Sequence, residues 1–106
     1  MNKHLIVLTV VVTAYSANCP IQGTGDRTST GRKASTTQGV AVDPKMIPLG
    51  SNVKIGNKWY IADDVGGDIK GRHIDLRLPS RGECLKFGRR TMKIYVDKRT
   101  NARNRK

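Results

Sequence analysis

The sequence predicts a mainly β protein that forms one small closed barrel, and three observations lead there. Its apolar segments are short and rich in valine and isoleucine, its 11 glycines indicate many tight turns, and its 106 residues leave room for one domain. A closed barrel satisfies the edges of every strand in a domain of this size. We therefore expect six short strands and one helical turn in a single domain over residues 1–96, followed by a disordered basic tail over residues 97–106.

The first predicted strand covers residues 5–16. The apolar run over residues 5–12 consists largely of β-branched side chains, which favour a strand over a helix. A charged start followed by a short apolar run is also typical of a signal peptide, although this run is too short to span a membrane as a helix. Cleavage after Ser16 would remove residues 13–16, which continue the run without a break. We therefore interpret the segment as a core strand rather than a signal peptide.

The other elements follow from alternating apolar residues and from turn residues between them. The remaining strands are predicted over residues 40–43, 51–55, 58–62, 74–78 and 91–96. Ser80 as an N-cap and Gly88 as a stop predict a short helical turn between the last two strands. Residues 17–39 are polar and without periodicity, which predicts a long surface loop, and residues 28–31 have the composition of a turn.

The net charge of +12 favours anionic partners, which include nucleic acid, anionic lipid and anionic cell-wall polymers. The alternative is a charged surface that serves solubility alone. No aromatic pattern of an RNA-binding sheet, no helix-turn-helix punctuation and no zinc spacing accompanies the charge. We therefore expect no specific nucleic-acid recognition.

The two cysteines, Cys19 and Cys84, cannot build a structural zinc site by themselves. Paired in a disulfide, they would close a long loop and stabilise the fold by about 4 kcal/mol in the chain-entropy model. That pairing would place the protein in an oxidising compartment. The alternative is two buried free thiols. No phosphate-binding loop, dinucleotide fingerprint or HExxH motif is present, so we expect neither a cofactor nor a metal.

Four of the eight acidic residues fall between Asp63 and Leu76, among three glycines. Asp75 projects from a predicted strand whose opposite face is apolar. Cleavage of a glycosidic bond needs a carboxylic acid whose pKa is raised by burial or by a second carboxylate, and Asp75 beside Asp64 suits that role. The alternative is that these aspartates are turn residues or calcium ligands. His73, next to these carboxylates, could bind substrate, but it is a lone histidine outside any nucleophile context, so we assign it no catalytic role.

Several motifs occur together in a specific order. They are Thr13-Ala14-Tyr15, Thr30-Gly31, Ala41-Val42-Asp43-Pro44, Ile47-Pro48-Leu49-Gly50, Asp64-Val65-Gly66-Gly67, Ile69-Lys70-Gly71 and Ile74-Asp75-Leu76. This order resembles the three-aspartate (3D) domain, the catalytic module of the membrane-bound lytic transglycosylase A family and of small stationary-phase and spore-associated muralytic proteins. The resemblance implies a double-psi β-barrel. It also implies lytic transglycosylation, in which the MurNAc–GlcNAc β-1,4 bond of peptidoglycan is broken and a 1,6-anhydroMurNAc end is formed.

The resemblance also implies roles for individual residues. Asp75 matches the general acid and base, Asp64 would lie beside it to orient it or raise its pKa, and Asp43 would brace the site. The residues expected to line the sugar groove, or to let the backbone approach the polysaccharide, are Thr13, Tyr15, Lys70, Gly66 and Gly67.

The sequence departs from the family at two aspartates. The family often has a small residue where this chain has Asp68, and Asp63 adds a further charge. We interpret both as solvent-exposed and peripheral, and an effect on substrate preference is the alternative.

The sequence therefore predicts a monomeric lytic transglycosylase that acts on peptidoglycan in the periplasm or cell wall. Anionic wall polymers are further expected partners, and no membrane span is expected. A non-catalytic wall-binding barrel is the alternative, and a nucleic-acid binder, based on charge alone, ranks third. If residues 5–16 form a core strand, the chain carries no export signal, and a phage lysis or virion protein is one hypothesis for its route to the wall.

Overall fold

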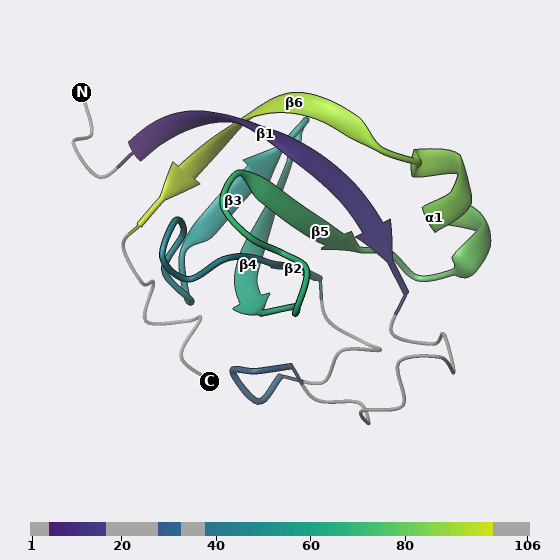
Figure 1. Cartoon of the computed structure of the whole chain (residues 1–106), viewed down its shortest axis with the longest axis horizontal. Coiled ribbons are helices and arrows are strands. Elements are labelled where there is room, and N and C mark those ends of the chain that lie inside the picture. Colours follow the sequence, from purple (N-terminus) through teal and green to yellow (C-terminus); the bar gives the residue numbers. More distant parts are fainter. Residues whose placement is uncertain (1–4, 17–27, 33–37, 99–106) are drawn as a thin grey trace.

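Six strands close into a barrel in the computed structural model, which describes residues 5–16, 28–32 and 38–98. The strands are β1 (Leu5–Tyr15), β2 (Gly39–Ala41), β3 (Asn52–Ile55), β4 (Lys58–Asp64), β5 (His73–Arg77) and β6 (Arg90–Asp97). Around the barrel they follow the order β1-β5-β2-β4-β3-β6 (Figure 1). The predicted mainly β, six-stranded barrel is confirmed.

Two neighbouring pairs of strands are parallel, β1 with β5 and β2 with β4, and the other four pairs are antiparallel. Parallel neighbours need crossover connections, which explains why strands adjacent in the barrel are distant in the sequence. One hairpin, between β3 and β4, turns at Gly56 with a φ of 63°. This arrangement places β5, in the middle of the chain's second half, between β1 and β2.

Valine and isoleucine fill the barrel interior, where β-branched side chains pack well on pleated strands. The fully buried apolar side chains include Val10, Val12, Val40, Val53, Ile74, Ile94 and Val96. In β5, Ile74 and Leu76 are buried while Asp75 between them is half-buried, so Asp75 lies on the outer face.

The N-terminal apolar run forms a strand, β1, as predicted. Residues 5–12 pair with β6 and residues 11–15 pair with β5, so the run is part of the barrel wall. At the other end, β6 extends to Asp97, one residue into the segment predicted as a tail. Residues 99–106 lie outside the described residues.

One short helix, α1 (Arg81–Phe87), precedes β6. Its N-cap is Ser80, whose hydroxyl accepts a hydrogen bond from the Glu83 amide, and Gly88 ends it at a φ of 68°. Both predicted boundary residues are confirmed, because a capping side chain and a left-handed glycine satisfy the end groups of a short helix. Among the described residues, no helix is long and apolar enough to cross a membrane.

The predicted loop between the first two strands is described only in part. Residues 28–31 form the predicted turn, in which the Gly31 amide donates to the Thr28 carbonyl at 2.9 Å. Gly31 has a φ of 90°, a conformation that favours glycine.

Removal of a core side chain should lower the stability of the barrel. Ile94→Ala removes a side chain that is 0% exposed, and we expect it to lower the free energy of unfolding by about 2–5 kcal/mol. Leu85→Ala, at a position that is 72% exposed, should change it by less than about 0.5 kcal/mol. Urea unfolding followed by circular dichroism measures both. Equal effects of the two variants would contradict the assignment of Ile94 to the core.

Candidate active site

The parallel pairing of β1 with β5 places Thr13 directly opposite Asp75. The Thr13 hydroxyl donates to Asp75 Oδ1 at 3.0 Å. The hydroxyl oxygen of Thr13 also lies 2.9 Å from His73 Nε2. A hydroxyl has one proton to donate, so when Asp75 is ionised His73 Nε2 is the donor to Thr13. The result is a directed chain from His73 through Thr13 to the Asp75 carboxylate.

Burial dominates the environment of the Asp75 carboxyl. It raises the pKa of Asp75 above its ordinary value, while the hydrogen bond from Thr13 and the positive charge of His73 act to lower it. Desolvation disfavours the ionised carboxylate, which makes this group a better proton donor near neutral pH than an exposed aspartate. The expected rise in the pKa of Asp75 is thus present, with burial as its main cause.

Asp64 and Asp75 flank the same residue of β2. Ala41 lies opposite Asp64 on β4 and opposite Asp75 on β5. Two strand spacings separate the two aspartates, so their Cα atoms are roughly 10 Å apart. Pairing with β2 therefore brings the two predicted residues to one region.

Asp64 is held by contacts of its own. Its Oδ1 accepts hydrogen bonds from the amide of Ser29 at 3.0 Å, from the hydroxyl of Ser29 at 2.8 Å and from the amide of Val65 at 2.9 Å. Its Oδ2 accepts from the Tyr15 hydroxyl at 3.4 Å. Asp64 thereby fastens residues 28–32 to the end of β4.

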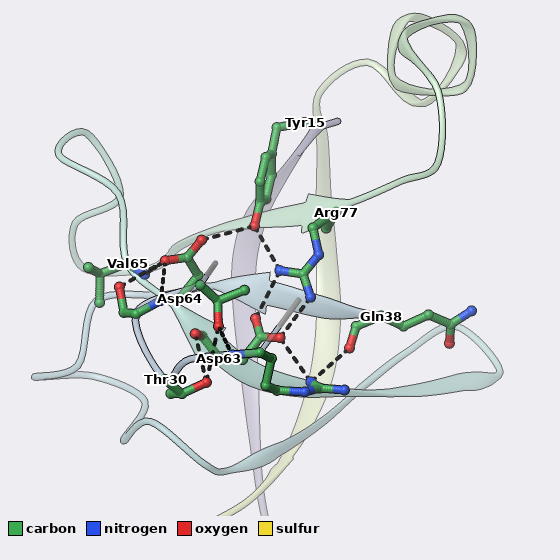
Figure 2. A network of polar contacts seen from close by, with 10 residues as sticks. Tyr15, Thr30, Gln38, Asp63, Asp64, Val65 and Arg77 are labelled. Atoms are coloured by element: carbon green, nitrogen blue, oxygen red, sulfur yellow. Dashed lines mark hydrogen bonds and ion pairs between the residues drawn. The ribbon is translucent and has the colours of Figure 1, made fainter. Parts of the chain in front are cut away.

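Tyr15 connects Asp64 to a buried arginine. Its hydroxyl accepts from Arg77 Nη1 at 3.1 Å, and Figure 2 shows it between the Asp64 carboxylate and the Arg77 guanidinium. Burial raises the pKa of Tyr15 to about 12, against the lowering effect of Arg77. The phenol therefore stays protonated at neutral pH and donates to Asp64.

Asp63 lies at the centre of a buried ion-pair network, so its interpretation as solvent-exposed and peripheral is wrong. Its side chain is 0% exposed. Its two carboxylate oxygens accept from Arg77 at 3.0 and 2.7 Å, and one of them also accepts from Arg32 at 2.8 Å. Two cations offset the cost of removing this carboxylate from water. Asp68, by contrast, is exposed, as predicted.

A β-bulge explains why two consecutive aspartates reach one network. Val40 of β2 lies opposite Ala62 of β4. The next residue, Ala41, lies opposite Asp64, so Asp63 is an extra residue on β4. A bulge re-aims side chains that strict alternation would send to opposite faces. Asp64 consequently accepts a hydrogen bond from Tyr15 and Asp63 accepts from Arg77, and Arg77 in turn donates to the Tyr15 hydroxyl (Figure 2).

Asp43 braces the connection that follows β4. Its carboxylate accepts from the Lys45 amide at 3.0 Å and from the Gly71 amide at 2.8 Å. These bonds lower the pKa of Asp43, led by the one from Gly71, and the charge of Lys70 contributes. The Asp43 carboxylate thus fixes the backbone at Lys45 and Gly71, and its role in bracing a catalytic site stays a prediction.

The remaining predicted site residues lie on the same connection. Lys70 is exposed. Gly67 is exposed with open space where a Cβ would stand, whereas a Cβ on Gly66 would meet the Ile69 side chain at 2.8 Å. Packing against Ile69 thus requires glycine at 66 independently of any ligand.

Three further observations concern metals and cysteines. Among the described residues, no group of three or more histidine, cysteine or acidic side chains could hold a metal ion. Cys84 is in α1 and partly exposed. Its predicted partner Cys19 lies outside the described residues, so the disulfide stays a prediction.

A family model described as the 3D domain matches residues 38–97, more than half of the chain. The chain belongs to the 3D domain family. The match includes the three aspartates Asp43, Asp64 and Asp75, and the predicted family is confirmed.

Relatives of this 3D domain are found in Bacillus subtilis (strain 168). YabE, named for a proposed role in cell wall shaping, is 39% identical over 94 residues, which are 85% of this chain and 23% of YabE. The cell wall-binding protein YocH is 41% identical over 93 residues, which are 84% of this chain and 32% of YocH. The chain therefore spans less than half the length of these two relatives.

A solved structure supports the architecture. The Streptomyces papain inhibitor is similar to this 3D domain with a TM-score of 0.54 at 17% identity, covering 85% of this chain and 92% of that chain. At this identity the likeness concerns the fold alone. It confirms the double-psi β-barrel that the sequence predicts.

Five residues of the site were not predicted as site residues from the sequence, namely Ser29, Arg32, Asp63, His73 and Arg77. Arg77 carried a usable signal, because strand alternation places it on the same face as Asp75, two residues away. Ser29 and Arg32 reach the site from a polar stretch without periodicity, which offers no such signal. The sequence thus indicates the acids of this 3D domain more readily than the groups that hold them.

Loss of the negative charge should affect stability at Asp63 but not at Asp68. Asp63→Asn leaves the Arg77 guanidinium buried without its anionic partner, and we expect a loss of about 3–5 kcal/mol in the free energy of unfolding. Asp68→Asn is the matched control at an exposed position, with an expected change below about 0.5 kcal/mol. Denaturant unfolding of both variants at neutral pH tests this. If Asp63→Asn lowers the free energy of unfolding by less than about 1 kcal/mol, the value typical of an exposed ion pair, the buried network does not stabilise the fold as stated.

Proposed function

We propose that this 3D domain is a lytic transglycosylase that cleaves the MurNAc–GlcNAc β-1,4 bond of peptidoglycan and leaves a 1,6-anhydroMurNAc end. The observation that carries the proposal is the Asp75 carboxyl, half-buried on the outer face of β5 with a pKa raised by burial. Membership of the 3D domain family supports it. The chain supplies the acid within a surface that a polymer can approach.

Asp75 would act first as an acid and then as a base. Its proton goes to the glycosidic oxygen as the bond from that oxygen to C1 of MurNAc breaks, and positive charge develops at C1. The 6-hydroxyl of the same MurNAc then attacks C1, and its proton returns to Asp75. Atoms balance without water. Burial favours the protonated acid of the first step, and the bond from Thr13 favours the carboxylate that follows it.

Neighbouring groups would orient this chemistry. Asp64, fixed by Ser29 and Tyr15, supplies a negative charge on the far side of Ala41 that favours a cationic transition state. Asp43 holds the Gly71 backbone. Exposed Lys70 and the open surface at Gly67 would contact the glycan.

The place of action proposed for this chain is the cell wall, in line with the names of the relatives YabE and YocH. The charge of +12 would support contact with anionic wall polymers. The name of YocH refers to binding, which makes a non-catalytic wall-binding barrel the second candidate. Turnover separates the two candidates.

Removal of the acid tests the activity. Asp75→Asn keeps the shape of the side chain without its proton, and we expect product formation to fall by about 100- to 10,000-fold. The measurement is mass spectrometry of anhydro-muropeptides released from purified peptidoglycan. Asp68→Asn serves as the control and should retain activity. Absence of anhydro products from the unmodified chain, or full activity in Asp75→Asn, would reject the proposal, and binding without turnover would favour the second candidate.

The hydrogen bond from Thr13 should influence the pH dependence of the proposed activity. An acid must be protonated, so the rate should fall as pH rises through the pKa of Asp75. The Thr13 hydrogen bond lowers that pKa, and its removal in Thr13→Val should move the alkaline limb of the pH–rate profile to higher pH. Thr91→Val, at an exposed position on β6, is the control. Carboxyl NMR titration of Asp75 should shift in the same direction, and a limb that stays in place or moves to lower pH would count against the role of Thr13.

A further inference from the structure

Four side chains form a continuous row across the outer face of four adjacent strands. On β3, Lys54 lies directly opposite Trp59 of β4 on one side and opposite Tyr95 of β6 on the other. Tyr95 in turn lies opposite Val7 of β1. Directly opposite residues share one face of a sheet, so these four side chains stand side by side. We call this set the aromatic row.

The aromatic row is exposed where the strands otherwise bury their apolar side chains. Val7 is 50% exposed, Trp59 49% and Tyr95 40%, while Lys54 is intermediate. Leu5, at 40%, extends the apolar surface along β1. Contiguous exposed apolar side chains that include tryptophan and tyrosine mark interaction surfaces more often than scattered ones do.

The aromatic row is centred on β3, on the far side of the barrel from β5, and it reaches a neighbour of β5 only at Val7 of β1. In the strand order β1-β5-β2-β4-β3-β6, β3 is three positions from β5 in either direction around the closed barrel. Lys54 is therefore opposite the strand that carries Asp75, and the row is not an extension of the candidate active site. A ligand on the row would leave the outer face of β5 open.

We propose that the aromatic row is a second binding surface, which holds a peptidoglycan glycan strand other than the one at Asp75. The identity of the polymer rests on the proposed function, whereas the surface rests on strand register and exposure. Tryptophan and tyrosine combine a flat apolar face with a polar edge, and pyranose rings present apolar C–H faces between their hydroxyl groups. The two chemistries are complementary.

The spacing and charge of the row fit a carboxylated glycan. Trp59 and Tyr95 are separated by two strand spacings, roughly 10 Å, so each ring can contact a different sugar along one chain. Lys54 lies between them, where its ammonium can pair with a lactyl or peptide carboxylate. A nucleic acid would instead need several cations against successive phosphates, and the row offers one.

Trp59 is the only tryptophan of the chain, so its fluorescence reports on the row directly. The probe is peptide-free GlcNAc–MurNAc strands released from peptidoglycan by an amidase, titrated into the Asp75→Asn chain so that the glycan stays intact. We expect a change in Trp59 emission and protection from acrylamide quenching. Tyr95→Ala should weaken the binding by roughly tenfold. Leu85→Ala, which removes an exposed apolar side chain from α1, is the matched control and should bind unchanged.

Three results would overturn the inference: no response of Trp59, unchanged affinity in Tyr95→Ala, or an equal Trp59 response to duplex DNA or to anionic phospholipid vesicles. Because the titration measures binding in an inactive variant, it does not depend on turnover. Anhydro products without a Trp59 response would reject the second surface alone, and a ring-dependent Trp59 response without any products would reject the proposed activity alone.

Discussion

The buried ion pair between Asp63 and Arg77 is the interaction on which the rest of the site depends. Two bonds at 3.0 and 2.7 Å join the end of β4 to the end of β5. From this pair the network extends to Arg32 on one side and to Tyr15 on the other. A Cβ at residue 39 would overlap the Asp63 carboxylate, so β2 contributes a glycine where the pair passes closest to its backbone. Loss of either Asp63 or Arg77 would leave the charge of the other side chain buried without its partner.

The ion pair between Asp63 and Arg77 also explains why Asp63, Asp64 and Asp75 have different environments. Asp63 takes the charge of Arg77, and this ion pair, together with Tyr15, raises the pKa of Arg77 despite burial, which acts to lower it. Asp64 accepts hydrogen bonds from Ser29 and Tyr15. Asp75 is left with a hydroxyl and an imidazole, and burial prevails in raising its pKa. Carboxyl groups in unlike environments can take different tasks, as the two carboxyl groups of the lysozyme active site do.

Strands, caps and the acids of the site could be predicted from the sequence because each depends on local chemistry. Alternation fixed the faces of β5, and Ser80 and Gly88 fixed the ends of α1. Asp63 could not be placed, because one inserted residue on β4 shifts its register against β2 and cancels alternation there. Arg32 lies 31 residues from Asp63 in the sequence, so only the closed barrel reveals the contact between them.

The strand order of the barrel makes its two outer faces independent of one another. Asp75 needs β1 and β2 as neighbours, which supply Thr13 and Ala41. The aromatic row needs β4 and β6 around β3, and its last member, Val7, lies on β1 outside the part of that strand that pairs with β5. The central strands of the two faces, β5 and β3, lie on opposite sides of one ring of six strands. A close-packed core of valine and isoleucine lies between them. Under the two proposals made above, a glycan held on the aromatic row would leave the face of Asp75 free for chemistry without any movement of the barrel.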